Sequence, residues 1–256
     1  FYNMLKAKGI KISKEEFLKL KPFHWGFEFY EVFDLEKPKE ERGFDVIIGN
    51  PPYVASAGRG QISMKIEEKD KEIFKQFYEV AKEQFDLYTI FIERSLFILQ
   101  KRNGKFGYIV PDAILVRDTN YHIRNFILKR MSIKQIILAG KCFVGVDNSN
   151  SILLLSYPYS PKNVLIGIYV DVEYPENIIS ISALPKIRKN VYINYISQSN
   201  LNSLENKEFL IRATSQTLHV LDFLRKTTKP LRNFIQIRRG EELGVAVRVE
   251  FPIPIA

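Results

Sequence analysis

Residues 44–53 read Phe-Asp-Val-Ile-Ile-Gly-Asn-Pro-Pro-Tyr, so Asn50 stands between a mostly apolar run and two prolines, with Tyr53 after them. The Asn50 side chain offers a carbonyl oxygen, and Pro51 offers a backbone carbonyl on a residue without an N–H. Because Pro51 and Pro52 fix their own φ angles, both acceptors are expected on a stiff frame. Two such acceptors suit an NH2 donor, and Tyr53 supplies an aromatic face on which a flat ring can stack.

One donor that this arrangement would activate is the exocyclic amine of a nucleobase. Accepting both of its hydrogens draws the nitrogen toward tetrahedral geometry and returns its lone pair from the ring, so that a poor nucleophile becomes usable. A base in a duplex would have to leave the helical stack to reach the loop. Since positioning and dipoles carry this chemistry, the attack needs no general base with a shifted pKa.

The residues before the loop predict the element that holds it. Phe44 to Ile48 is rich in β-branched side chains and too short for a stable helix, which predicts a buried strand of a parallel sheet. Gly49 allows the backbone to turn. We therefore expect the Asn50 loop at the carboxyl end of a buried strand, where ligands bind in open α/β sheets.

Length and composition limit the class of protein. The 256 residues, 46% of them hydrophobic, are enough to bury a sizeable core. A net charge of +9 and a pI near 9.4 favour a polyanionic partner. Cys142 is the one cysteine of the sequence, which excludes an internal disulfide and a cysteine-based zinc site. With no apolar run long enough for a bilayer and no secretory signal at the start, we expect a cytoplasmic protein that does not bind membranes.

The stretch FDVIIGNPPY is similar to motif IV of the S-adenosylmethionine-dependent amino methyltransferases of DNA, whose (D/N/S)PP(Y/F) loop binds the target amine. The Asn form followed by Tyr resembles the adenine-N6 enzymes. The upstream stretch PFHWGFEFYEVF, residues 22–33, resembles one in large single-chain restriction-modification enzymes, although by itself it reads as a packed aromatic cluster. The resemblance implies an α/β fold, a Rossmann-like methyltransferase sheet with flanking helices, truncated at its N-terminus and joined to the start of a target-recognition domain.

The resemblance also implies roles for particular residues. The catalytic loop would be Asn50, Pro51, Pro52 and Tyr53. The run KCFVGVDN is similar to motif VIII, so Phe143 would stack on the face of the target adenine opposite Tyr53. The run DLYTIF, residues 86–91, is similar to motif V, so Phe91, Leu87 and Tyr88, together with Asn50, would bind the cofactor S-adenosyl-L-methionine. For Phe143 and the residues of 86–91, a side chain packed in the core is the competing interpretation, and for the Asn50 loop it is an ordinary Asn-Pro turn or a proline-rich ligand.

One feature departs from the family. These enzymes hold S-adenosylmethionine with a glycine-rich loop after the first strand of the sheet, and residues 1–43 contain no glycine cluster. The sulfonium methyl must be held in line with the amine for displacement. We therefore expect that the native enzyme has this segment, that the present chain lacks it, and that this chain alone is inactive.

Basic residues gather near the carboxyl end, where Arg232, Arg238 and Arg239 are candidates for DNA-backbone contacts. A solvated basic face is the alternative. We expect residues 1–190 to form the carboxyl-terminal part of the methyltransferase core, 191–230 a connector and 231–256 the beginning of a target-recognition domain.

The predicted function is site-specific adenine-N6 methylation of double-stranded DNA in a restriction-modification or related defence system, with possible nuclease and specificity regions elsewhere in the parent chain. Two alternatives stay open: a nucleic-acid-binding module without activity, and a methyltransferase for an amine of RNA or protein.

Local patterns predict the remaining elements. Ser13 followed by Glu16 is typical of a capping box for a helix that runs to Leu20. Apolar spacing predicts helices at residues 73–84, 86–100, 112–116, 121–129 and 214–225, and further strands at 106–111, 133–138, 152–155 and 164–170.

Overall fold

The computed structural model describes residues 2–54, 66–96, 100–143, 148–170, 191–229 and 233–234. The chain divides into two compact units, Phe1–Ser215 and Gln216–Ala256. The first unit contains the sheet and its helices, whereas α9 (Ser215–Thr227) supplies most of the described residues of the second. None of the helices in these ranges combines the length and the apolar character that crossing a bilayer requires.

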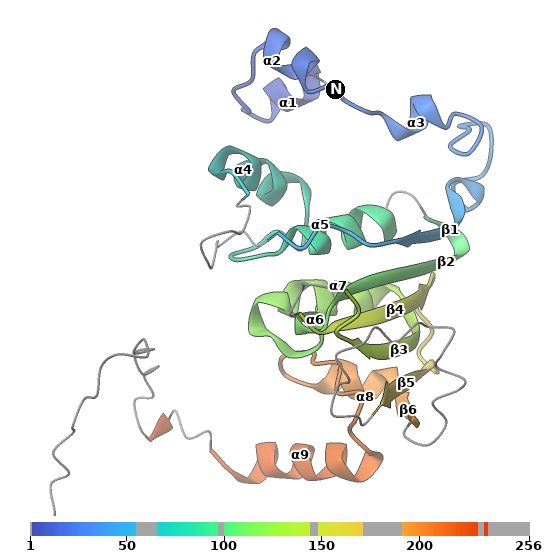
Figure 1. Cartoon of the computed structure of the whole chain (residues 1–256), viewed down its shortest axis with the longest axis vertical. Helices are drawn as coiled ribbons and strands as arrows, with labels where there is room; N and C mark the ends of the chain where they lie inside the picture. The colour runs from blue at the N-terminus through green and yellow to red at the C-terminus, as the bar shows by residue number, and fades with distance from the viewer. Residues whose placement is uncertain are drawn as a thin grey trace, which may run out of the picture. The chain divides into compact units, whose positions relative to one another are not determined.

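The described strands form one six-stranded sheet in the order β1-β2-β4-β3-β5-β6 (Figure 1). They are β1 (Phe44–Gly49), β2 (Gln100–Pro111), β3 (Ser132–Gly140), β4 (Asn150–Ser156), β5 (Val164–Val170) and β6 (Val191–Ser197). β1 runs parallel to β2, and β3 parallel to β5, whereas β4 is antiparallel to both β2 and β3 and β6 is antiparallel to β5. The carboxyl ends of β1, β2 and β3 consequently meet at one edge, and the expected α/β sheet with flanking helices is confirmed.

The helices of the first unit are short. They are α1 (Tyr2–Ala7), α2 (Lys14–Lys19), α3 (Trp25–Glu28), η1 (Lys39–Glu41), α4 (Glu68–Phe77), α5 (Leu87–Arg94), α6 (Ala113–Val116), η3 (Asp118–Asn120), α7 (Tyr121–Arg130) and α8 (Gln198–Ser203). α7 contacts α5, α6 and α8 as well as β3, so these helices form a layer against the sheet. The capping box is confirmed, because the Glu16 N–H donates to Ser13 Oγ and the Ser13 N–H donates to Glu16 Oε2.

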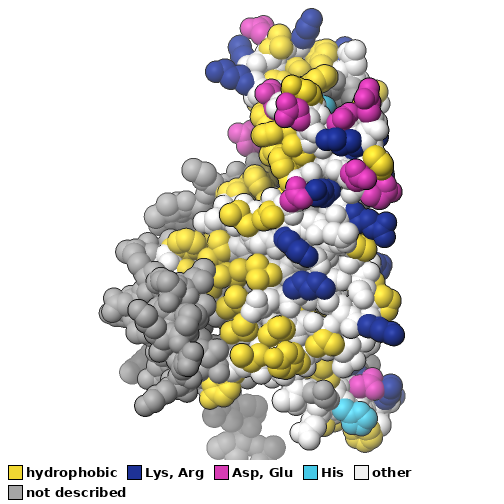
Figure 2. Space-filling view, turned by 90° about the vertical axis from the view of Figure 1, so that its right-hand side faces the viewer, with side chains coloured by type: hydrophobic (Ala, Val, Ile, Leu, Met, Phe, Trp, Pro, Cys, Tyr) yellow, Lys and Arg dark blue, Asp and Glu magenta, His cyan; other side chains and the backbone are white. Residues whose placement is uncertain are grey.

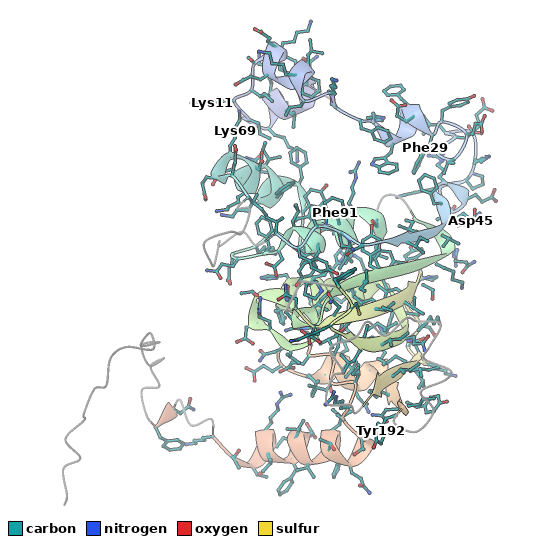
Figure 3. All side chains as sticks on the ribbon, viewed as in Figure 1. Lys11, Phe29, Asp45, Lys69, Phe91 and Tyr192 are labelled. Carbon is teal, nitrogen blue, oxygen red and sulfur yellow. The ribbon has the colours of Figure 1, made fainter. Side chains whose placement is uncertain are left out.

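An aromatic cluster holds the chain at the start of β1. The ring of Phe44 meets the rings of Phe29 and Phe33 edge to face, with centroids 5.3 and 5.6 Å apart. Trp25 stacks on Phe29 at 5.6 Å. Aromatic contacts of this kind contribute beyond the area that they bury, and they confirm that the stretch around Trp25 is a packed cluster. Phe29 is labelled in Figure 3.

β1 lies at an edge of the described sheet. The run from Phe44 does form a strand parallel to its neighbour, but our prediction that this strand is buried is wrong, since Val46 is 58% and Ile48 79% exposed. Among the described residues β1 pairs with β2 alone. The β-branched run identified a strand, whereas its burial depends on partners that are distant in sequence.

The region expected to be a connector, residues 191–230, begins instead inside the sheet. β6 pairs with β5 along its whole length, and α8 follows it directly. Gln198 at the start of α8 is fully buried, accepts from the Ile133 N–H at 2.9 Å and donates to the Met131 carbonyl at 2.7 Å. The scattered Asn and Ser residues of this region led to the prediction of a connector, although the aromatic and β-branched residues of β6 have high strand propensity.

The other expected elements are present, most of them with shifted bounds, whereas β5 has the predicted bounds. The helices predicted at 73–84 and 86–100 are α4 and α5, and both end earlier than expected. The second must end because Gln100 already pairs with Phe44 in the sheet. Arg124, fully buried in α7, ties the helical layer together: its guanidinium donates to the carbonyls of Ile114, Arg117 and Asn206 at 2.7–3.2 Å.

Candidate active site

The Asn50 loop is fixed at two points beyond the end of β1. The Tyr53 hydroxyl donates to the Ile109 carbonyl of β2 at 3.1 Å, and the Leu87 N–H at the start of α5 donates to the Val54 carbonyl at 2.8 Å. Pro51 is buried, whereas Asn50 is exposed. The loop is therefore held to the sheet and to α5, while the Asn50 side chain is exposed.

Close contact between the two strands requires the glycine before the loop. Gly49 is paired with Tyr108 of β2, and a Cβ added to Gly49 would lie 3.0 Å from Tyr108 Cε1. The Tyr108 ring cannot move away easily, because its hydroxyl lies 2.7 Å from Ser95 Oγ in a buried hydrogen bond. Gly49 thus lets the chain enter the loop beside an immobilised ring, a role in addition to the turn that we expected from it.

The Tyr53 phenol stays protonated well into the alkaline range. Burial, and secondarily the nearby Cys142 thiol, raises the pKa of Tyr53 to about 12. Burial also raises the pKa of Cys142, whose Sγ donates to the carbonyl of Ala139 at 3.2 Å. Both groups are therefore neutral hydrogen-bond donors, and the thiol has no character of an activated nucleophile.

Phe143 follows Cys142 beyond the carboxyl end of β3, at the same edge of the sheet as the Asn50 loop. Its side chain is partly buried. Cys142, the residue before Phe143, also contributes to the raised pKa of Tyr53. The structure thus places the loop of Asn50 and Tyr53 and the segment of Phe143 at the same edge of the sheet, although these residues are far apart in the sequence.

Asn150 is a residue of this edge that the sequence reasoning did not single out. It is fully buried at the start of β4, and its Nδ2 donates to the carbonyl of Asn148 at 2.9 Å and to that of Gly140 at 3.4 Å. The two bonds close the span between the end of β3 and the start of β4, and Phe143 lies within that span. An asparagine in a run of Asp, Asn and Ser carries no sequence signal that distinguishes such a contact from a surface turn.

The three residues of α5 expected to bind a cofactor differ in exposure. Phe91 is 42% exposed and projects from the helix (Figure 3), and Leu87 is partly buried. Tyr88 is 1% exposed, and its hydroxyl donates to Asn120 Oδ1 at 3.0 Å. Its ring meets the Tyr53 ring edge to face at 6.3 Å. A direct cofactor contact from Tyr88 does not fit this burial, and its observed role is to support Tyr53.

Burial dominates the titration of the groups beneath the loop. It raises the pKa of Tyr88 well above its usual value, and the Asp86 carboxylate adds to this effect. It also raises the pKa of Asp86, and the neighbouring Tyr88 and Arg117 side chains partly offset this rise. Within the described ranges, His, Cys, Asp and Glu form no group of three or more that could hold a metal ion. The basic candidates Arg232, Arg238 and Arg239 lie outside the described residues.

Comparison with known proteins agrees with this arrangement. The sequence profile of the Eco57I restriction-modification methylase family matches residues 2–143. The type II restriction enzyme and methyltransferase RM.Eco57I of Escherichia coli is 34% identical over 140 residues, which are 55% of this chain and 12% of that protein. The type II methyltransferase M.HincII of Haemophilus influenzae is 30% identical over 184 residues, which are 70% of this chain and 33% of that protein.

In three dimensions the chain is similar to the methyltransferase subunit of a type I restriction-modification system from Streptococcus thermophilus. The TM-score is 0.49 and the sequence identity 18%, over 72% of this chain and 41% of that one. The family profile extends from α1 through β3 and so includes the Asn50 loop, α5 and Phe143. Because the match covers more than half of the sequence, the chain belongs to the Eco57I restriction-modification methylase family.

Proposed function

We propose that the protein to which this chain belongs transfers a methyl group from S-adenosylmethionine to adenine N6 in double-stranded DNA, as part of a restriction-modification system. The observation that carries the proposal is the exposed Asn50 on a loop held to β2 through Tyr53 and to α5 through Val54. A rigid pair of acceptors at the carboxyl end of a strand is the feature that an amine nucleophile requires.

The chain's own groups would position and activate the base. Asn50 Oδ1 and the Pro51 carbonyl would accept the two hydrogens of the amine. Tyr53 and Phe143, which follow strands at the same edge of the sheet, would stack on a base that has left the duplex, which is worth roughly 1–3 kcal/mol per base. The neutral phenol of Tyr53 keeps a negative charge away from the base, because its pKa is about 12.

The residues of this chain fit only part of an S-adenosylmethionine site. Phe91 is the exposed aromatic of α5 and, with Asn50, would contact the cofactor. The bound cofactor would supply the methyl group. Residues 1–43 offer Gly9, Gly26 and Gly43 singly, without the glycine cluster that holds such a cofactor. We therefore propose that other parts of the complete protein complete the cofactor site.

The partners of the complete protein are likewise proposals. The chain spans 12% and 33% of the lengths of the two relatives described above, and one of them is named as both a restriction enzyme and a methyltransferase. We propose that further regions of the protein supply nuclease or specificity functions. Arg232, Arg238 and Arg239 remain candidates for contacts to DNA phosphates.

The test is methyl transfer from labelled S-adenosylmethionine to mixed-sequence duplex DNA by the complete protein. Digested DNA is scored by mass spectrometry for N6-methyladenine and N4-methylcytosine. The variants are Asn50→Ala, which removes an acceptor, and Asn50→Asp, which keeps one. Asn200→Ala, at an exposed position of α8, is the matched control.

We expect N6-methyladenine from the wild type and the control, and a loss of about 100-fold or more in Asn50→Ala, comparable to the removal of one preorganised polar group elsewhere. Asn50→Asp should retain measurable activity. A folded wild type that binds cofactor and DNA yet yields no modified base would refute the proposal. Methylation of RNA or of protein in the same assay would then indicate the alternative substrate.

A further inference from the structure

A cavity of about 820 Å³ lies at the edge of the sheet opposite the Asn50 loop. Its lining residues come before β1 and β3, at or before the start of β2, and after the end of β4. Because β4 is antiparallel to β2 and β3, its end lies where the parallel strands start, so all of these residues belong to that edge of the sheet. The length of β1 separates this edge from Asn50, roughly 20 Å at about 3.3 Å per residue. The cavity is therefore a separate site, and its volume is within the range of small-molecule pockets.

The cavity wall carries an excess of positive charge. One acidic residue, Glu40, lines it, against five cations: Lys39, Arg42, Arg102, Lys129 and Arg130. Asp45, labelled in Figure 3, marks the start of β1, the end of the strand at which the cavity lies. Figure 2 shows the molecule from that side. Lys and Arg side chains lie across the middle of the face in Figure 2. Such a concentration of like charge favours an anionic ligand.

Two of these cations already interact with other groups of the chain. The guanidinium of Arg42 donates to the carbonyls of Leu35 and Lys37 at 2.7 and 2.8 Å, which fixes the segment that forms one wall. Arg130 forms an ion pair with Glu79 at 2.8 Å. Within the described part of the chain, the other three cations are exposed and make no such ion pair: Lys39, Arg102 and Lys129. They can therefore contact a ligand without breaking an existing bridge.

Aromatic side chains make up half of the uncharged lining residues: Phe33, Phe126, Tyr157 and Tyr159. Phe126 is buried, and the Arg130 guanidinium lies over its ring at 4.5 Å. Phe33 is held by Phe44, and the Tyr159 N–H donates to the Arg130 carbonyl at 2.8 Å. Tyr157, which is 41% exposed, presents an aromatic surface within the same lining. Rings of this kind stack on nucleobases regardless of base identity.

We propose that this cavity is a second ligand site, which takes a nucleoside phosphate. The base packs against Tyr157, and the phosphates meet Lys39, Arg102 and Lys129. A free nucleotide and the phosphorylated terminal nucleotide of a nucleic-acid strand share this chemistry. The inference rests on the cavity alone and does not depend on the methyl transfer proposed above.

The experiment is calorimetric titration of the chain with ADP, adenosine, pyrophosphate and a 5′-phosphorylated thymidine dinucleotide. The test variant is Arg102→Gln/Lys129→Gln. The matched control, Lys105→Gln/Lys162→Gln, removes the same charge at exposed positions that do not line the cavity. A further pair, Tyr157→Ala and Tyr157→Phe, separates loss of the ring from loss of the hydroxyl. Circular dichroism and unfolding midpoints confirm that each variant folds.

We expect ADP to bind more tightly than either adenosine or pyrophosphate. The test pair should weaken ADP binding by about tenfold or more, as loss of a charge-assisted contact does, whereas the control pair should change it less than twofold. Tyr157→Ala should weaken ADP but not pyrophosphate, and Tyr157→Phe should restore ADP binding. Tighter binding of the dinucleotide than of ADP would support the proposal with a strand end as the source, and the reverse order would support it with a free nucleotide.

Three results would overturn the proposal. ADP that fails to bind at millimolar concentration would show that the cavity takes no nucleotide. Equal losses in the test and control pairs would show that net charge alone attracts the ligand. Pyrophosphate that binds as tightly as ADP would show that no base is held.

Discussion

Tyr53→Phe tests how the Asn50 loop is held, because it removes the hydroxyl and keeps the ring. The lost interaction is the hydrogen bond to the Ile109 carbonyl, 3.1 Å long and partly buried. Such a bond contributes about 0.5–1.5 kcal/mol to the free energy of unfolding. Ile109 is itself only partly buried, so water can replace the donor, and we expect a loss near 1 kcal/mol. Tyr195→Phe, at a side chain that is 66% exposed, should change stability by less than about 0.5 kcal/mol.

The stability difference between the wild type and Tyr53→Phe also depends on pH. The pKa of Tyr53 is raised to about 12 in the folded chain, above its ordinary value of 10.0. Between these values the unfolded chain releases a proton that the folded chain keeps. The stabilising contribution of Tyr53 is therefore complete below pH 10 and is lost as the pH rises through 12.

Two assays measure these effects. Urea unfolding near neutral pH, followed by circular dichroism, gives the free-energy difference between wild type and each variant. Ultraviolet absorbance of phenolate, recorded as wild type minus Tyr53→Phe, isolates the titration of one tyrosine. A difference midpoint near the ordinary tyrosine pKa, or a stability loss no larger than that of Tyr195→Phe, would refute the view that the phenol is buried and anchors the loop.

Two further substitutions test the framework around the site. Arg124→Met should lower the free energy of unfolding by about 3 kcal/mol or more, because three carbonyl oxygens lose a charged donor. The control Arg117→Met, at an exposed side chain, should lower it by less than about 0.5 kcal/mol. Equal losses of the two variants in urea unfolding would contradict the role of the buried guanidinium. Asn150→Ala should cost about 1–3 kcal/mol through its two lost donors, and Asn150→Asp should cost more, since a buried carboxylate would then face the carbonyls of Gly140 and Asn148. An Asp variant as stable as the wild type would show that Nδ2 does not close this span.

Much of the fold could be predicted from short segments. Ser13 and Glu16 form the capping box that their spacing indicates, and the β-branched run that ends at Gly49 forms a strand. Both predictions rest on residue types and spacings within a few positions of the chain, which sequence reasoning can evaluate directly.

Other features could not be predicted in this way. The exposure of Ile48 depends on what covers β1, and β6 is recognised only when its pairing with β5 is seen. Tyr88 has the aromatic character of a ligand-binding residue, but its partner Asn120 lies beyond β2 in the sequence and makes it a buried support. Secondary-structure propensity and hydrophobic periodicity do not predict contacts between residues that are far apart in the sequence.

The sequence by itself determined the chemistry of the candidate site. An asparagine followed by two prolines and a tyrosine has its acceptors, its stiffness and its aromatic face whatever surrounds it, because covalent geometry sets them. Only the tertiary structure decided that Tyr53 is held by Ile109, that Asn150 closes the span around Phe143 and that a basic, aromatic cavity forms at the opposite edge. These features arise from side chains that meet only when the strands pair, so their geometry is a property of the packed sheet.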